Sequence, residues 1–157
     1  MKIILFSVGK SHETYVRQGI ADFTQRLNKY FSTEWNILAS PKNAASLSDD
    51  ELKLQEGKLI LSQLLPTDFM VLLDERGKPL TSPQLAKLLQ QRANESVHRL
   101  VFLIGGAFGV SDAVFKRANF VWSLSPLVFP HMLVRLILAE QLYRAGTILR
   151  NEKYHHL

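Results

Sequence analysis

The chain has no cysteine among its 157 residues. Without cysteine there is no disulfide framework, no thiolate metal site and no cysteine nucleophile. No run of about 18 uncharged apolar residues occurs, so we expect no transmembrane helix. The first apolar segment, residues 2–8, is too short for a signal peptide. We therefore expect a cytosolic protein.

The common signatures of nucleotide and RNA binding are also missing. The glycine-rich turn GGAFG at residues 105–109 is not a GxGxxG fingerprint and comes late in the chain. It contains no lysine, which argues against a phosphate-binding P-loop, and no RRM, KH or OB signature is found. No repeat or linker divides the sequence, so we predict one domain over residues 1–157. The net charge of +5 permits attraction to nucleic acid without proving it.

Apolar runs alternate with segments of helical spacing along the chain, which predicts a single layered α/β domain with a mostly parallel sheet of five to six strands. The expected strands are residues 2–8, 35–38, 69–73, 100–104 and 120–122. Helices are expected behind Ser11, behind the capping box of Ser48 and Glu51, behind Thr81 or Ser82, behind Ser111, and from Pro130 or His131. Residues 74–79 are expected to form a charged turn.

Three loops follow strand ends, where open parallel sheets bind ligands. The glycines of residues 105–109 allow close approach of a ligand, although a plain turn is the ordinary interpretation. The loop Leu124–Phe129 has almost no side-chain chemistry, but its backbone groups still need partners. It either packs into the core or surrounds a flat ring such as adenine, and composition does not decide between these.

The last third of the chain ends in a nearly apolar helix and a polar tail. Because the helix lacks a full polar face, we expect it to be buried or to pack against a second subunit. Arg144 is four residues from Glu140, so an ordinary helix ion pair is its alternative role. The tail, residues 150–157, is expected to fray by default. No cluster of Asp, Glu and His completes a metal site with His155 and His156, and we predict no metal.

The segments KIILFSVGK, LLDERGKP, FLIGGAFG, WSLSPLVFPHMLVRLILAEQLYRA and NEKYHH together resemble a known family. The chain is similar to the SPOUT class of methyltransferases and, within it, to the ribosomal RNA large-subunit methyltransferase H family. That family methylates N3 of a pseudouridine in 23S rRNA. The resemblance covers essentially the whole chain. It departs from the usual pattern at Ala107 and Phe108, where small or polar residues are expected.

The resemblance implies a C-terminal trefoil knot that binds S-adenosylmethionine, and a homodimer that acts on helix 69 of 23S rRNA in the assembled 70S ribosome. The positions that match the family's cofactor contacts are Leu73, Gly105, Leu124, Ser125, Pro126, Leu127, Val128 and Phe129. Tail residues are implied to act across the dimer interface. The candidates for catalysis are His155 as general base, Arg144 as a cation near the acceptor, and Tyr154 as a hydrogen-bonding or stacking ring, with Lys153 beside them.

Recognition of rRNA is expected to use the dimer's own basic surface, since the chain is too short for a separate RNA-binding domain. Candidate contacts are Lys10, Arg17, Lys116 and Arg117, which could equally be solvated charges. Three alternatives stay open: methylation of another RNA such as tRNA, a ribosome-binding factor without turnover, and a generic nucleotide-binding α/β protein.

Overall fold

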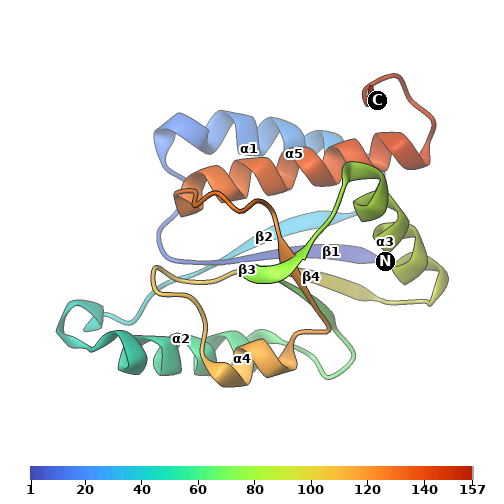
Figure 1. Cartoon of the computed structure of the whole chain (residues 1–157). Helices are drawn as coiled ribbons and strands as arrows, with labels where there is room; N and C mark the ends of the chain where they lie inside the picture. The colour runs from blue at the N-terminus through green and yellow to red at the C-terminus, as the bar shows by residue number, and fades with distance from the viewer. Residues whose placement is uncertain (157) are drawn as a thin grey trace.

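The computed structural model describes residues 1–156, in which strands and helices alternate along the chain (Figure 1). The strands are β1 (Lys2–Val8), β2 (Thr33–Leu38), β3 (Phe69–Pro79), β4 (Arg99–Ile104) and β5 (Phe120–Ser123). The helices are α1 (Thr14–Leu27), α2 (Asp49–Gln63), α3 (Ser82–Asn94), α4 (Asp112–Arg117) and α5 (His131–Leu149), with the 3-10 turn η1 (Ala44–Ser46). The last residue of the predicted domain, Leu157, lies outside the described residues.

The sheet has the strand order β2-β1-β4-β3-β5. Every pair of neighbouring strands in it is parallel. This confirms the predicted α/β class and the mostly parallel sheet. The sheet has five strands, the lower of the two numbers expected. The strand order is compatible with the trefoil knot, which stays a prediction.

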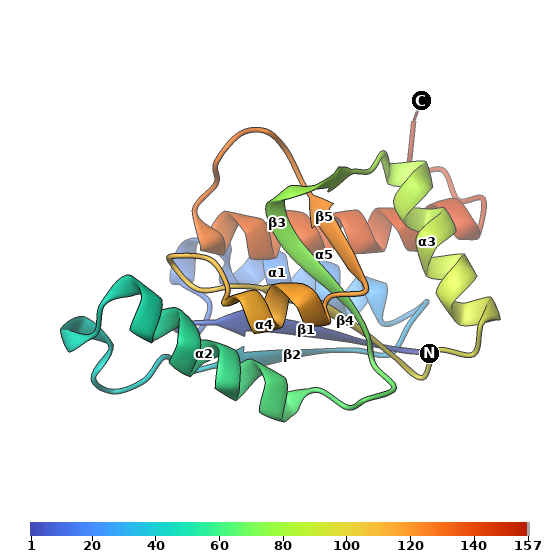
Figure 2. The ribbon, with the colours of Figure 1, turned by 60° about the horizontal axis from the view of Figure 1, so that its bottom comes forward.

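Helices cover both faces of the sheet, with α1, α3 and α5 on one face and α2 and α4 on the other (Figures 1 and 2). Along β1, Ile3 and Leu5 point into the first core, whereas Ile4, Phe6 and Val8 point into the second. Burial on both faces explains why β1 is a continuous apolar run. Each such side chain contributes about 1.5–3 kcal/mol when it is fully buried.

Four of the five expected helix starts agree with the structure, and the one expected behind Ser11 does not. Ser48 and Glu51 form the predicted capping box, and Thr81 forms another with Gln84. The predicted cap at Ser11 is wrong: α1 begins three residues later, behind Glu13, which makes no side-chain cap bond. The intervening segment has another role, because the carbonyl of Lys10 accepts a 2.8 Å hydrogen bond from Arg135.

The predicted turn at residues 74–79 is also wrong, because β3 continues to Pro79. A register shift lies between Leu73 and Lys78, both of which pair with Trp122 of β5. Gly77 sits in this irregular stretch against the backbone of β5, and a Cβ built on it would lie 2.6 Å from the carbonyl oxygen of Val121. The bulge therefore accommodates the charged residues Asp74, Glu75 and Arg76 within β3, and β3 pairs with β5 again beyond them.

The final helix α5 packs against both α1 and α3. Its buried side includes Leu138, Leu142 and Arg135, of which Arg135 is only 1% exposed. The Arg135 guanidinium donates to the hydroxyl of Ser7 at 2.8 Å as well as to Lys10. Half-buried apolar side chains, Leu133 among them, occupy the rest of α5. Within residues 1–156, no helix is both long and apolar enough to cross a membrane.

The tail beyond α5 is tied down, so the expectation of a frayed end is wrong. The backbone turns at Asn151, whose φ is 55°, and the amide of Glu152 donates to the carbonyl of Thr147 at 3.0 Å. Tyr30 of the α1–β2 connection donates a 2.6 Å hydrogen bond to the Glu152 carboxylate. These contacts fix the direction in which the tail leaves the helix.

Candidate active site

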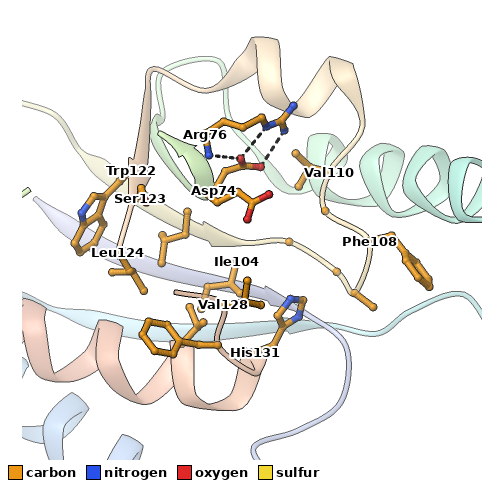
Figure 3. A pocket seen from close by; sticks show the side chains of 18 of the residues that line it. Asp74, Arg76, Ile104, Phe108, Val110, Trp122, Ser123, Leu124, Val128 and His131 are labelled. Atoms are coloured by element: carbon orange, nitrogen blue, oxygen red, sulfur yellow. Dashed lines mark hydrogen bonds and ion pairs between the residues drawn. The ribbon is translucent and has the colours of Figure 1, made fainter. Parts of the chain in front are cut away.

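A cavity of about 640 Å³ opens at the ends of β4 and β5 and at the irregular stretch of β3 (Figure 3). Its walls are the segments that follow Leu73, Ile104 and Trp122. The three segments expected from the sequence therefore meet at one place, although the first of them belongs to β3 and is not a loop. The volume lies within the range of about 300–1,000 Å³ that is typical of small-molecule sites.

The structure brings nearly all of the residues that match the family's cofactor contacts to this cavity. Those lining it are Leu73, Gly105, Leu124, Ser125, Leu127, Val128 and Phe129. Pro126 is the exception: it is exposed and does not line the cavity.

The apolar loop is packed into the core at its start only, where Leu124 contacts the first core. Leu127 is 71% exposed and Val128 is 84% exposed, both at the cavity. Exposed apolar side chains that line a cavity offer surface to a ligand or to a partner protein. Ser125 restrains the loop from inside, since its hydroxyl accepts a 3.0 Å hydrogen bond from the amide of Leu127.

The glycine-rich wall is a tight turn with an aromatic apex. The amide of Gly109 donates to the carbonyl of Gly106 at 3.1 Å, and Gly109 adopts a φ of 86°. Phe108 is 53% exposed at this apex and lines the cavity. Ser111 ends the turn and caps α4 as predicted, because its hydroxyl accepts from the amide of Val114 at 3.4 Å.

Charged groups in the cavity were missed from the sequence, because residues 74–79 were interpreted as a turn. Arg76 forms a 2.8 Å ion pair with Asp74 and lies over the ring of Phe115. The hydrogen bond from Arg76 holds the pKa of Asp74 below its usual value, so the carboxylate stays ionised. Asp74 directly follows the apolar run of residues 69–73, and this position was the sequence signal that could have placed the pair in the cavity.

His131, the first residue of α5, also lines the cavity (Figure 3). Burial lowers the pKa of His131, and the nearby positive charge of Arg135 lowers it further. The neutral imidazole is therefore the form present at neutral pH. Lys53 of α2, Glu75 of β3 and Asp112 of α4 also belong to the charged lining.

A second polar cluster lies at the other end of α5 and contains two of the three predicted catalytic residues. Arg144 donates to Glu140 at 2.6 Å, which is the ordinary ion pair allowed by their spacing. Tyr154 adds to it: its hydroxyl donates to the same carboxylate oxygen at 3.0 Å, and the Arg144 guanidinium lies 4.7 Å from the centre of its ring. Burial and this hydrogen bond raise the pKa of Tyr154, which keeps the phenol protonated.

His155, the third predicted catalytic residue, follows directly. Both of its ring nitrogens are buried, and neither has a hydrogen-bond partner among residues 1–156. Buried polar atoms in proteins normally have a hydrogen-bond partner. Lys153 is exposed beside it.

The cavity and the tail cluster meet different turns of α5. The cavity is lined by His131 and Val134, whereas the cluster is anchored at Glu140 and Arg144, so the nearest of these residues are about 9 Å apart along the helix at 1.5 Å per residue. None of the tail residues 150–156 lines the cavity of its own copy.

The basic candidates differ in their surroundings. Lys10, Arg17 and Lys116 are exposed. Arg117 is instead used within the fold, because its guanidinium donates to the carbonyls of Leu65 and Asp68 at 3.1 and 2.9 Å. Among residues 1–156, no group of three or more His, Asp or Glu side chains is arranged to hold a metal ion.

The sequence matches the family described as "Predicted SPOUT methyltransferase" over residues 1–155. The chain belongs to this family. S-adenosylmethionine is the methyl donor of SPOUT methyltransferases and hence the cofactor of this chain.

Curated relatives cover the whole length of the chain. A protein named "Ribosomal RNA large subunit methyltransferase H" from Cytophaga hutchinsonii is 46% identical over 156 residues, which cover 99% of this chain and 100% of that one. The protein of the same name from Parabacteroides distasonis is 44% identical, with 99% of each chain covered. These identities confirm the kinship expected from the sequence segments.

Solved structures share the fold at much lower identity. A "Probable Methyltransferase" from Bordetella pertussis Tohama I has a TM-score of 0.58 at 14% identity, with 92% of this chain and 94% of that one covered. A "probable methylase family protein" from Haemophilus influenzae Rd KW20 has a TM-score of 0.52 at 11% identity, with 97% and 67% covered.

Proposed function

We propose that this SPOUT methyltransferase transfers the methyl group of S-adenosylmethionine to N3 of a pseudouridine in helix 69 of 23S rRNA, on the assembled 70S ribosome. The observation that carries the proposal is the cavity formed by β3 and by the ends of β4 and β5, lined by seven of the eight residues predicted to contact the cofactor. The similarity to proteins named for methylation of large-subunit rRNA supports this substrate. The site of action is then the cytoplasm, where ribosomes are found.

The apolar and charged groups of the cavity lining support this choice of cofactor. Leu124, Leu127 and Phe129 offer apolar surface to the adenine ring, while backbone groups of the same loop offer hydrogen bonds to its edge. The sulfonium of the cofactor is positive, and the ionised carboxylate of Asp74 lies in the cavity wall. The cofactor supplies an activated methyl group that leaves sulfur as a carbon–nitrogen bond forms.

A homodimer would complete the site. No tail residue between 150 and 156 lines the cavity of its own copy, so the tail that acts at a cavity would belong to the second copy. The half-buried apolar side of α5 and the open Leu127 and Val128 offer the surface for this contact. Closed two-fold dimers bury the same patch on both copies, which places two tails and two cavities symmetrically.

The tail residues would prepare the acceptor. N3 of pseudouridine must lose its proton before or during attack, and His155 takes it as general base. The negative charge that remains spreads over the two flanking carbonyl oxygens, where the Arg144 guanidinium stabilises it. Tyr154 holds the guanidinium against Glu140 and stacks beside it. Alignment of N3 with the methyl group supplies much of the remaining barrier reduction.

The exposed Lys10, Arg17 and Lys116 are the basic contacts proposed for rRNA. The decisive experiment is mass spectrometry of 23S rRNA from a deletion strain with and without the gene. We expect the N3-methylated pseudouridine to disappear and to return on complementation. Incorporation of labelled methyl groups into 70S ribosomes, free subunits and tRNA then identifies the substrate, and incorporation into tRNA alone contradicts the proposal.

A further inference from the structure

Helix α2 contacts both ends of the glycine-rich wall through two consecutive residues. Glu56 lies against Gly106, at the start of the turn, and Gly57 lies against Ser111, at its end. Figure 2 shows α2 and α4 side by side beneath the sheet, with the turn leading into α4. The wall of the cavity therefore rests on α2, although neither Glu56 nor Gly57 lines the cavity itself.

The contact between Glu56 and Gly106 leaves no room for a side chain at position 106. A Cβ built there would overlap one carboxylate oxygen and would lie 2.9 Å from the carboxyl carbon Cδ and 3.0 Å from the other oxygen. These distances are shorter than van der Waals contact. The same holds at Gly57, whose Cβ would overlap the hydroxyl of Ser111 and lie 3.2 Å from its Cβ. In each contact, therefore, the side chain of one segment fills the space left by the glycine of the other.

Glu56 is an unusual residue for such a contact. It is only 4% exposed, and its hydrogen-bond donor among the described residues is the Ser40 hydroxyl at 3.3 Å. No cation pairs with it there. Burial raises the pKa of Glu56, while the bond from Ser40 opposes that rise. A buried carboxyl group without a cation destabilises a fold compared with an apolar residue of the same size, so overall stability does not explain its presence.

We propose that Glu56 is a positioning residue that holds Gly106, and with it the Gly105–Val110 wall, at the distance from the apolar loop that S-adenosylmethionine requires. The inference rests on the proposed function, since it concerns the same cavity. Its carboxyl group acts through shape, because no backbone amide of the wall donates to it in the described residues. A neutral side chain of equal size at position 56 would therefore hold the wall in place, and a smaller side chain would not.

The test compares cofactor affinity in a cycle of variants of the full-length protein. Calorimetry with S-adenosylmethionine is performed on wild type, E56A, E56Q, G106A and E56A/G106A, with the exposed neighbour Q55A as the matched control. We expect E56A to weaken binding roughly tenfold or more, which corresponds to about 1.4 kcal/mol, because a displaced wall loses contacts with the cofactor. KM for the cofactor should rise while kcat at saturation stays close to wild type. E56Q and Q55A should bind like wild type.

The double variant provides the sharper result. The methyl group of G106A would occupy space vacated in E56A, so E56A/G106A should bind more tightly than G106A alone. Coupling of this kind is expected only for residues in contact. Wild-type affinity in E56A, loss of affinity in E56Q equal to that in E56A, or independent effects of the two single changes would each overturn the proposal. If the wild type itself binds no cofactor, the proposed function fails instead.

Thermal unfolding without cofactor shows whether each variant is folded. If E56A or G106A does not fold, the second contact gives the same test. G57A should weaken cofactor binding, and S111A should restore part of it in the G57A background by removing the hydroxyl that clashes. Equal affinities of G57A and G57A/S111A would then overturn the proposal.

Discussion

The hydroxyl of Tyr154 donates a 3.0 Å hydrogen bond to the carboxylate of Glu140, fourteen residues earlier on α5. The same oxygen accepts from Arg144, so one carboxylate orients two of the residues proposed to act on the acceptor. The Glu140 side chain is 18% exposed, which shields the pair from solvent more than an ordinary surface ion pair.

Replacing Glu140 should therefore impair turnover without affecting the cofactor. In E140Q we expect kcat to fall by about tenfold or more, because supporting partners of reactive groups often contribute that much. The Kd for S-adenosylmethionine should stay unchanged, since Glu140 does not line the cavity. Hydrogen exchange of the tail amides should increase. D22N, which breaks the comparable pair of Asp22 and Arg26 on α1, is the control and should leave kcat intact.

Two inactive variants should restore one another if the site is built from two copies. We choose H155A to disable the tail and G105V to block the cavity, where even a Cβ at position 105 would lie 2.7 Å from Val110. Mixed in equal amounts under subunit exchange, half of the dimers are mixed and each has one intact site. Activity should then recover to about one quarter of wild type. Activity no greater than that of the separate variants would argue for a site within one chain.

Acid should destabilise the protein partly through His131. Its pKa lies below the usual 6.5 in the folded state, so just below pH 6.5 the unfolded chain binds more protons than the folded one. The stabilisation is fully present above pH 6.5 and is lost as the pH falls through the lower, folded pKa. The free energy of unfolding in urea should thus fall less steeply from about pH 7 to pH 5 in H131N than in wild type. Parallel curves for the two proteins would contradict this assignment.

Two glycines should respond very differently to alanine. In G77A the new Cβ would meet the backbone of Val121, which cannot move without breaking the β3–β5 pairing, and we expect a loss of about 1–3 kcal/mol or more. In G109A the new Cβ would lie in open space. Only the φ of 86° opposes the change, and we expect a loss of about 1 kcal/mol in the free energy of unfolding. Chemical denaturation measures both. A smaller effect of G77A than of G109A would show that the bulge is not packed as described.

Features that depend on local pattern were predictable from the sequence. The strands were visible as apolar runs, the capping boxes as pairs three residues apart, and the cavity as the meeting point of strand ends. The extension of β3 was not, because Asp74, Glu75 and Arg76 read as a solvated turn until β5 is known to pair beyond them. The ordering of the tail was also hidden, since Tyr30 and Glu152 are 122 residues apart in the sequence.

The guanidinium of Arg135 fastens the end of the first strand, through Ser7 and Lys10, to the last helix. Arg135 is 128 positions from Ser7 and 125 positions from Lys10 in the sequence. During synthesis the amino-terminal strand is made first, but Arg135 can reach it only when nearly the whole polypeptide has been translated. A nascent protein truncated before α5 would therefore leave the Ser7 hydroxyl and the Lys10 carbonyl without this donor.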